Sequence, residues 1–106
     1  MMMHMNYGHS KGKNIIDKKY AKIMQTAVNK ESGYGLAMMN NSKIIPGITL
    51  TGHTGSAYGL YSALFFNPAK KYGFIVITNG CNIPDSDDFN PLLEDCISAL
   101  YDAYIE

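Results

Sequence analysis

GHTGSAYGLYSALFFNPAKKYGFIVITNG is the sequence of residues 52–80. In this chain of 106 residues, that segment contains the clearest strand and turn signals. Residues 72–79, which are rich in β-branched and aromatic residues, predict one strand, and residues 60–67 predict another. Between them, Pro68 opens a short polar segment, and proline favours the early position of a turn. Strands joined by so short a connection pair antiparallel, so the stretch predicts a meander.

Upstream of this stretch the pattern also favours extended structure. Residues 34–39 predict a strand, residues 40–42 a turn, and residues 44–55 a second strand. Pro46, near the start of the second strand, has no N–H to donate, so that end is expected at an edge or a bulge.

Helices are expected before and after the meander along the chain. Residues 1–5 resemble the end of a helix that closes near Gly8, followed by a loop over residues 9–14. Asp17 is a candidate N-cap for a helix over residues 18–29, which carries apolar residues at helical spacing. Its apolar stripe comprises Tyr20, Ile23, Met24, Ala27 and Val28.

At the C-terminal end, Asn90 and Pro91 suit the N-cap and first position of another helix. Its apolar stripe comprises Leu92, Leu93, Cys96, Ile97, Leu100, Tyr101 and Tyr104. The prediction is therefore an α+β fold, one domain over residues 1–106, with a small antiparallel meander, an N-terminal helix and a C-terminal amphipathic helix packed on one face.

Composition narrows the function classes. A hydrophobic share of 46% with 17% charged residues is ordinary for a globular protein, and a formal net charge of +0 argues against nucleic-acid binding. No apolar run reaches the length of a membrane span, and the first residues lack the features of a signal peptide. The two cysteines, Cys81 and Cys96, leave a reduced pair and a disulfide equally open.

The charges are segregated along the chain. Six lysines fall in the first thirty residues, and seven acidic residues fall after residue 84. The favoured interpretation is two solvated helix faces that face each other, and a polybasic binding tail is the alternative. The residues are Lys11, Lys13, Lys18, Lys19, Lys22 and Lys30, then Asp85, Asp87, Asp88, Glu94, Asp95, Asp102 and Glu106.

The informative motif begins with His53-Thr54-Gly55. A glycine-containing turn follows it, then a strand ending in Asn-Pro and a strand ending in Thr-Asn-Gly. With the upstream Tyr34-Gly35-Leu36, it resembles serine β-lactamases of class C and related penicillin-binding proteins and esterases. The resemblance covers roughly residues 15–105 and implies a partial β-lactamase/transpeptidase-like fold, the C-terminal portion of such a domain. Members of this family are usually periplasmic or extracellular in bacteria; the localisation of this chain stays open.

The resemblance assigns four substrate-binding residues. His53 stands where the family usually has lysine, so any role for its charge becomes pH-dependent and the likeness leans towards peptidases and esterases. Thr54 matches the hydroxyl that hydrogen-bonds the substrate, and Gly55 the position without a side chain. Ser56 matches the residue whose backbone N–H forms part of the oxyanion hole. The alternative for His53 is an ordinary strand histidine.

The family's nucleophile motif, S-x-x-K at the start of a helix, has no clear counterpart. The one match, Ser10-Lys11-Gly12-Lys13, lies in a predicted loop about forty residues before His53, and no Y-x-N or S-x-N occurs. We therefore expect no catalytic residue in this chain and no activity alone: it corresponds to the C-terminal part of a serine hydrolase, as a fragment or a derived standalone domain. The alternative is a non-catalytic binding or assembly module.

Three further features of the sequence concern a metal, a nucleic acid and a second copy of the chain as partners. A methionine- and histidine-rich start suits Cu(I), but a buried helix end is favoured, and neither metal nor cofactor is expected. Tyr58, Tyr61, Phe65 and Phe66 suit base stacking, but core and rim positions are favoured. Strand 72–79 has no charge and no proline, so a homo-oligomer through an exposed sheet edge or the flanking helices is expected. A full-length parent would bind a peptide or β-lactam-like ligand.

Overall fold

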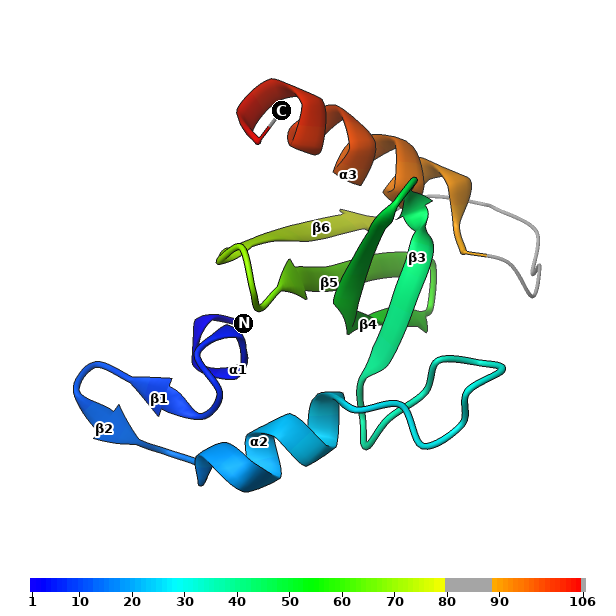
Figure 1. The fold of residues 1–106 in the computed structure, drawn as a ribbon. Coiled ribbons are helices and arrows are strands. Elements are labelled where there is room, and N and C mark those ends of the chain that lie inside the picture. Colours follow the sequence, from blue (N-terminus) through cyan, green and yellow to red (C-terminus); the bar gives the residue numbers. More distant parts are fainter. Residues whose placement is uncertain (80–88, 106) are drawn as a thin grey trace.

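The computed structural model, which describes residues 1–79 and 89–105, has the predicted α+β fold (Figure 1). Four antiparallel strands form one sheet in the order β3-β4-β5-β6, so the predicted meander is confirmed. The strands are β3 (Met39–Ile45), β4 (Ile48–Ala57), β5 (Leu60–Asn67) and β6 (Tyr72–Asn79). The helices are α1 (Met2–Met5), α2 (Lys18–Gln25) and α3 (Pro91–Tyr104), and a small hairpin joins β1 (His9–Ser10) to β2 (Lys13–Asn14).

Two tight connections set the register of the sheet. Tyr58 and Gly59 turn the chain between β4 and β5 with φ of 52° and 80°, the pair of positive values that a two-residue hairpin turn requires. Between β5 and β6, the Asn67 side chain accepts hydrogen bonds from the backbone N–H groups of Ala69 and Lys70. Local side-chain chemistry thus closes the Pro68 turn as predicted.

Helix α3 begins as predicted and covers one face of the sheet. The Asn90 side chain accepts hydrogen bonds from the backbone N–H groups of Leu92 and Leu93, which caps the helix. Leu93 and Ile97 are then buried against the strands. The buried members of this main core are Ile44, Ile45, Leu50, Ala63, Phe65, Phe74, Leu93 and Ile97.

The opposite face of the sheet carries the N-terminal segment (Figure 1). Met5 of α1 and Met38 are buried there with Phe66 of β5, and Met1 and Leu64 pack around them. Met5, at the end of α1, is thus a core residue, which agrees with the favoured interpretation of a buried helix end. Helices α2 and α3 lie on opposite sides of the sheet, so the basic and acidic helices do not face each other.

Helix α2 is shorter than predicted and buries a different face. Asp17 caps it, accepting from Lys19 N–H at 2.8 Å, but it ends at Gln25 because Thr26 is extended and donates its hydroxyl to the Lys22 carbonyl. The predicted stripe is wrong: Ala21 and Gln25 are the buried residues, and Val28 is exposed. The buried Gln25 side chain donates an amide N–H to the His4 carbonyl.

The predicted strand over residues 34–39 and the predicted turn over residues 40–42 are wrong. Gly35 N–H donates to the Met38 carbonyl, so this segment is itself a turn, and residues 40–42 lie in β3. The reason is tertiary: the Asn40 side chain donates to the Gln25 carbonyl and accepts from the Thr51 hydroxyl. The predicted strand over residues 44–55 is interrupted, because the chain reverses at Pro46–Gly47: residues 44–45 belong to β3 and residues 48–55 to β4. The irregularity in the pairing lies earlier than expected, as a register shift between Asn41 and Ile45. Cys81, Asp85, Asp87 and Asp88 lie outside the described residues, so the question of a disulfide between Cys81 and Cys96 lies outside them too.

His4 makes the stability of the N-terminal segment sensitive to pH. Burial, and secondarily the positive N-terminus, lower the pKa of His4 below its ordinary 6.5, and its buried Nδ1 has no partner among the described residues. Protonation therefore favours the unfolded state, so stability should fall as pH falls through 6.5 and level off below the folded pKa. Urea midpoints at pH 7.5 and pH 5.5 should differ more for the native chain than for His4→Gln; an equal difference would contradict this.

Candidate functional site

The four predicted substrate-binding residues occupy the last part of β4. His53 to Ser56 pair on one side with Leu64, Ala63, Ser62 and Tyr61 of β5. On the other side, β3 begins at Met39, opposite Gly52. Within the described residues, positions 53–57 therefore have a neighbouring strand on one side only.

The pairing pattern identifies the backbone groups at this open edge. The two-residue turn closes on the pair Ala57 and Leu60, so the backbone groups of Ala57 point towards β5. Direction alternates along a strand, so those of Gly55 also point to β5, whereas those of Thr54 and Ser56 point away. On the β3 side, Asn40 stands opposite Thr51 but donates its N–H to the Gly33 carbonyl, away from β4, which agrees with this alternation. The N–H and C=O of Thr54 and Ser56 thus face the open edge.

His53 is held by two partners. The hydroxyl of Tyr34 lies 2.6 Å from Nε2, and the two rings meet edge to face with centroids 5.9 Å apart. Nδ1 hydrogen-bonds the Thr54 carbonyl, and because a carbonyl only accepts, Nδ1 carries the proton. In the neutral ring Nε2 is then the acceptor, and the Tyr34 hydroxyl donates to it. Both ring nitrogens are engaged, and the group presented beyond the imidazole is the Tyr34 oxygen.

The remaining predicted residues divide between the two faces of the sheet. Side chains alternate along β4, so the Thr54 and Ser56 hydroxyls lie on the opposite face from the His53 imidazole. The sequence placed these side chains in one site; the structure brings their backbones together at the edge but separates the side chains. At Gly55, an added Cβ would lie 2.8 Å from the Ser62 Oγ. Tyr34, absent from the predicted site, reaches it from a loop nineteen residues away, and no spacing rule indicates that.

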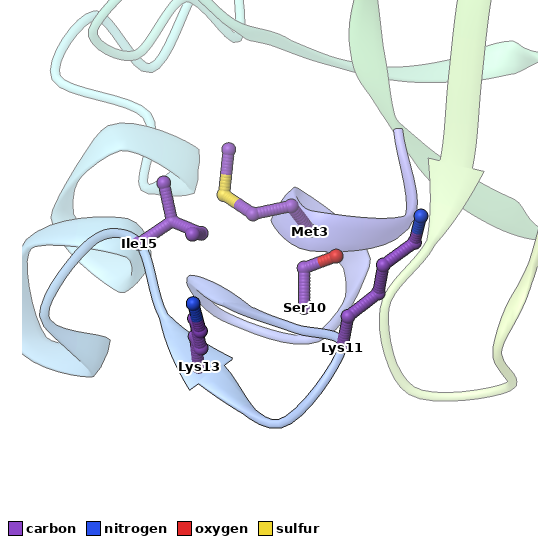
Figure 2. Close-up of a pocket in the computed structure, with 5 residues that line it drawn as sticks. All are labelled: Met3, Ser10, Lys11, Lys13 and Ile15. Atoms are coloured by element: carbon purple, nitrogen blue, oxygen red, sulfur yellow. The ribbon is translucent and has the colours of Figure 1, made fainter.

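The S-x-x-K match lies elsewhere in the molecule. Ser10 and Lys13 are cross-strand partners of the β1–β2 hairpin, joined by Lys11 and Gly12, both with positive φ. The motif is therefore a hairpin and not the start of a helix. Ser10, Lys11 and Lys13 help to line a pocket of about 590 Å³, and no residue of β4 lines it. Figure 2 shows the lining side chains. The lining residues are Met3, Ser10, Lys11, Lys13 and Ile15.

The other candidate ligands find little support. Phe65 and Phe66 are fully buried, which confirms them as core residues and removes them from any stacking surface. In the described part of the chain, no group of three or more His, Cys, Asp or Glu side chains is placed to hold a metal ion. None of the helices within residues 1–79 and 89–105 has the length and hydrophobicity to cross a membrane.

Comparison with known proteins gives no match, whether to family models, to curated proteins or to solved structures. The candidate site therefore stands on its geometry and on the motif order in the sequence.

Proposed function

We propose that this chain is the substrate-strand region of a β-lactamase/DD-peptidase-like serine hydrolase and binds an extended ligand along the edge of β4. The observation that supports it is the open edge at Thr54 and Ser56, next to the Tyr34–His53 pair. This is the H-T-G segment that the family resemblance singles out.

The proposed ligand lies beside β4 as an added strand. An extended peptide satisfies its own groups against the N–H groups of Thr54 and Ser56 and the C=O of Ser56, which is the general mode of strand addition. The Thr54 C=O already accepts from His53 Nδ1. An acyl compound with a carbonyl, peptide or β-lactam-like, accepts from the Ser56 N–H, and this donor would be one half of an oxyanion hole. Ligand affinity then depends on the backbone of Ser56 and not on its hydroxyl.

The Tyr34–His53 pair supplies the polar end of this site. While Nε2 is an acceptor, the Tyr34 oxygen keeps lone pairs for a donor group of the ligand. The pair therefore presents a hydrogen-bond acceptor at this end of the site.

We propose binding without turnover for the chain alone. The only S-x-x-K lies in the β1–β2 hairpin, and the sequence has no Y-x-N or S-x-N. An oxyanion donor without a nucleophile and its base cannot form an acyl intermediate.

The binding test is a titration of the labelled chain with benzylpenicillin and with an N-acylated D-alanyl dipeptide, followed by amide chemical shifts. At millimolar ligand, shifts should centre on Thr54 and Ser56, and the protein mass should stay unchanged. Ser56→Pro should abolish them by removing the edge N–H, whereas Ser56→Ala should preserve them. Shifts centred elsewhere, or binding that survives Ser56→Pro in a folded chain, would refute the proposal, and a covalent adduct lost in Ser10→Ala would refute the absence of turnover.

A second candidate function is a non-catalytic assembly module. It is favoured by a separate observation: no strand in the described part of the chain pairs with the outer edge of β6, and two isoleucines of β6 are exposed. On this proposal the chain is a homo-oligomer, whether or not β4 binds a ligand.

A further inference from the structure

Strand β6 forms the other edge of the sheet. Among the described residues no strand pairs with its outer side. Its eight residues include no charge and no proline, and the side chains of Ile75 and Ile77 are 53% and 67% exposed. Charge, proline and short length are the features that normally prevent an edge from pairing, and β6 has none of them.

The register of β5 shows which groups of β6 are free. Leu60 and Leu64 direct their backbone groups to β4, so Tyr61, Ala63 and Phe65 direct theirs to β6. The partners of these residues, Phe74 among them, are therefore satisfied. Within residues 1–79 and 89–105, the N–H and C=O groups that lack a strand partner belong to Gly73, Ile75, Ile77 and Asn79.

We propose that the chain forms a twofold dimer in which β6 pairs antiparallel with β6 of a second copy, with Val76 opposite Val76 at the axis. This register pairs each Ile75 with the Ile77 of the second copy and each Gly73 with its Asn79, so all four free residues of each strand are paired. If the twofold axis passed through Ile75 or Ile77 instead, one of the four free residues of each strand would have no partner among the four of the other. The result is a continuous sheet of eight strands.

Three features select a second copy as the occupant. The edge is self-complementary about Val76, as an isologous interface requires. Directly opposed isoleucines from the two copies cover each other on one face of the sheet. Neither β6 nor the net charge of +0 opposes self-association by repulsion. The interface is independent of the proposed ligand site, because β5 separates β6 from β4.

Sedimentation equilibrium of the full chain at micromolar to millimolar concentration tests the dimer. The native chain should reach twice its mass of 11.7 kDa, and Ile75→Lys/Ile77→Lys should remain monomeric because the substitutions gather four lysines at the axis. The matched control is Ile15→Lys, at an isoleucine of similar exposure (61%) on another surface, which should dimerise like the native chain. A monomeric native chain, an unaffected double-lysine variant or assembly beyond the dimer would overturn the proposal.

Disulfide trapping tests the register in a Cys81→Ser/Cys96→Ser background. Cα atoms of a non-hydrogen-bonded antiparallel pair lie about 4.5 Å apart, within disulfide range, so Val76→Cys should cross-link to a dimer. Ile77→Cys, although more exposed, should cross-link far more slowly because its opposite residue is Ile75. Equal rates, or faster trapping at Ile77, would exclude this register.

Discussion

Alanine in place of Gly52 should destroy most of the folded population at room temperature. A Cβ at this position would lie 1.9 Å from the Leu64 carbonyl oxygen and 2.7 Å from the Phe65 Cα. Both are backbone atoms of the paired strand, so no rotamer change relieves the clash, and β4 must separate from β5. We expect the free energy of unfolding to fall by more than about 4 kcal/mol, a large share of the roughly 5–15 kcal/mol typical of a domain.

Far-ultraviolet circular dichroism with urea titration measures this effect, and Gly55→Ala is the matched control on the same strand. Its Cβ would meet only the Ser62 Oγ, the end of a side chain that can rotate. We expect a change of under about 1 kcal/mol for Gly55→Ala. Equal losses for the two variants would show that β4 and β5 do not approach as described.

The parts of the fold that the sequence predicted are those with local causes. Proline at the turn of residues 68–71, β-branched residues in β6 and the Asn90 cap each act within a few residues, and all are present in the structure. The β1–β2 hairpin also had a local signal, because Gly12 is the second residue of its two-residue turn. The prediction of a loop over residues 9–14 overlooked this signal.

The errors arise where contacts distant in sequence decide the conformation. Asn40 has a poor intrinsic preference for strands, yet it lies in β3 because its side chain bridges the Gln25 carbonyl and the Thr51 hydroxyl. Helix α2 stops at Gln25 although apolar residues continue, because Gln25 bonds to α1 and Thr26 turns away. A helical period of apolar residues does not contain this information.

The candidate site shows the same division. The sequence located His53 to Ser56, and the period of two in a strand already implied that the imidazole and the Thr54 hydroxyl lie on opposite faces. The open edge was not predictable, since it depends on where β3 begins. Tyr34 was not predictable either, because its contact with His53 follows from the turn that replaced the expected strand.

Phe65→Ala should cost about 3–5 kcal/mol of unfolding free energy, the range for truncating a buried aromatic side chain. Phe65 is fully buried, stands opposite Phe74 in the register of β5 and β6, and meets Phe89 edge to face with centroids 5.6 Å apart. The cavity would open between the sheet and α3, where the main core is centred.

Urea denaturation of Phe65→Ala can be compared with Tyr104→Ala, an aromatic truncation at an 80% exposed position of α3, for which we expect a change within about 0.5 kcal/mol. A loss below about 1 kcal/mol for Phe65→Ala would contradict the packing of α3 on the sheet. If the large loss is found, amide exchange should also rise in β4 and β6, because both strands pair with β5. Within the described residues, no strand pairs with the other edge of either strand over the segments of the proposed ligand and dimer contacts. One core residue would then weaken both proposed sites, since each depends on a strand that β5 holds in register.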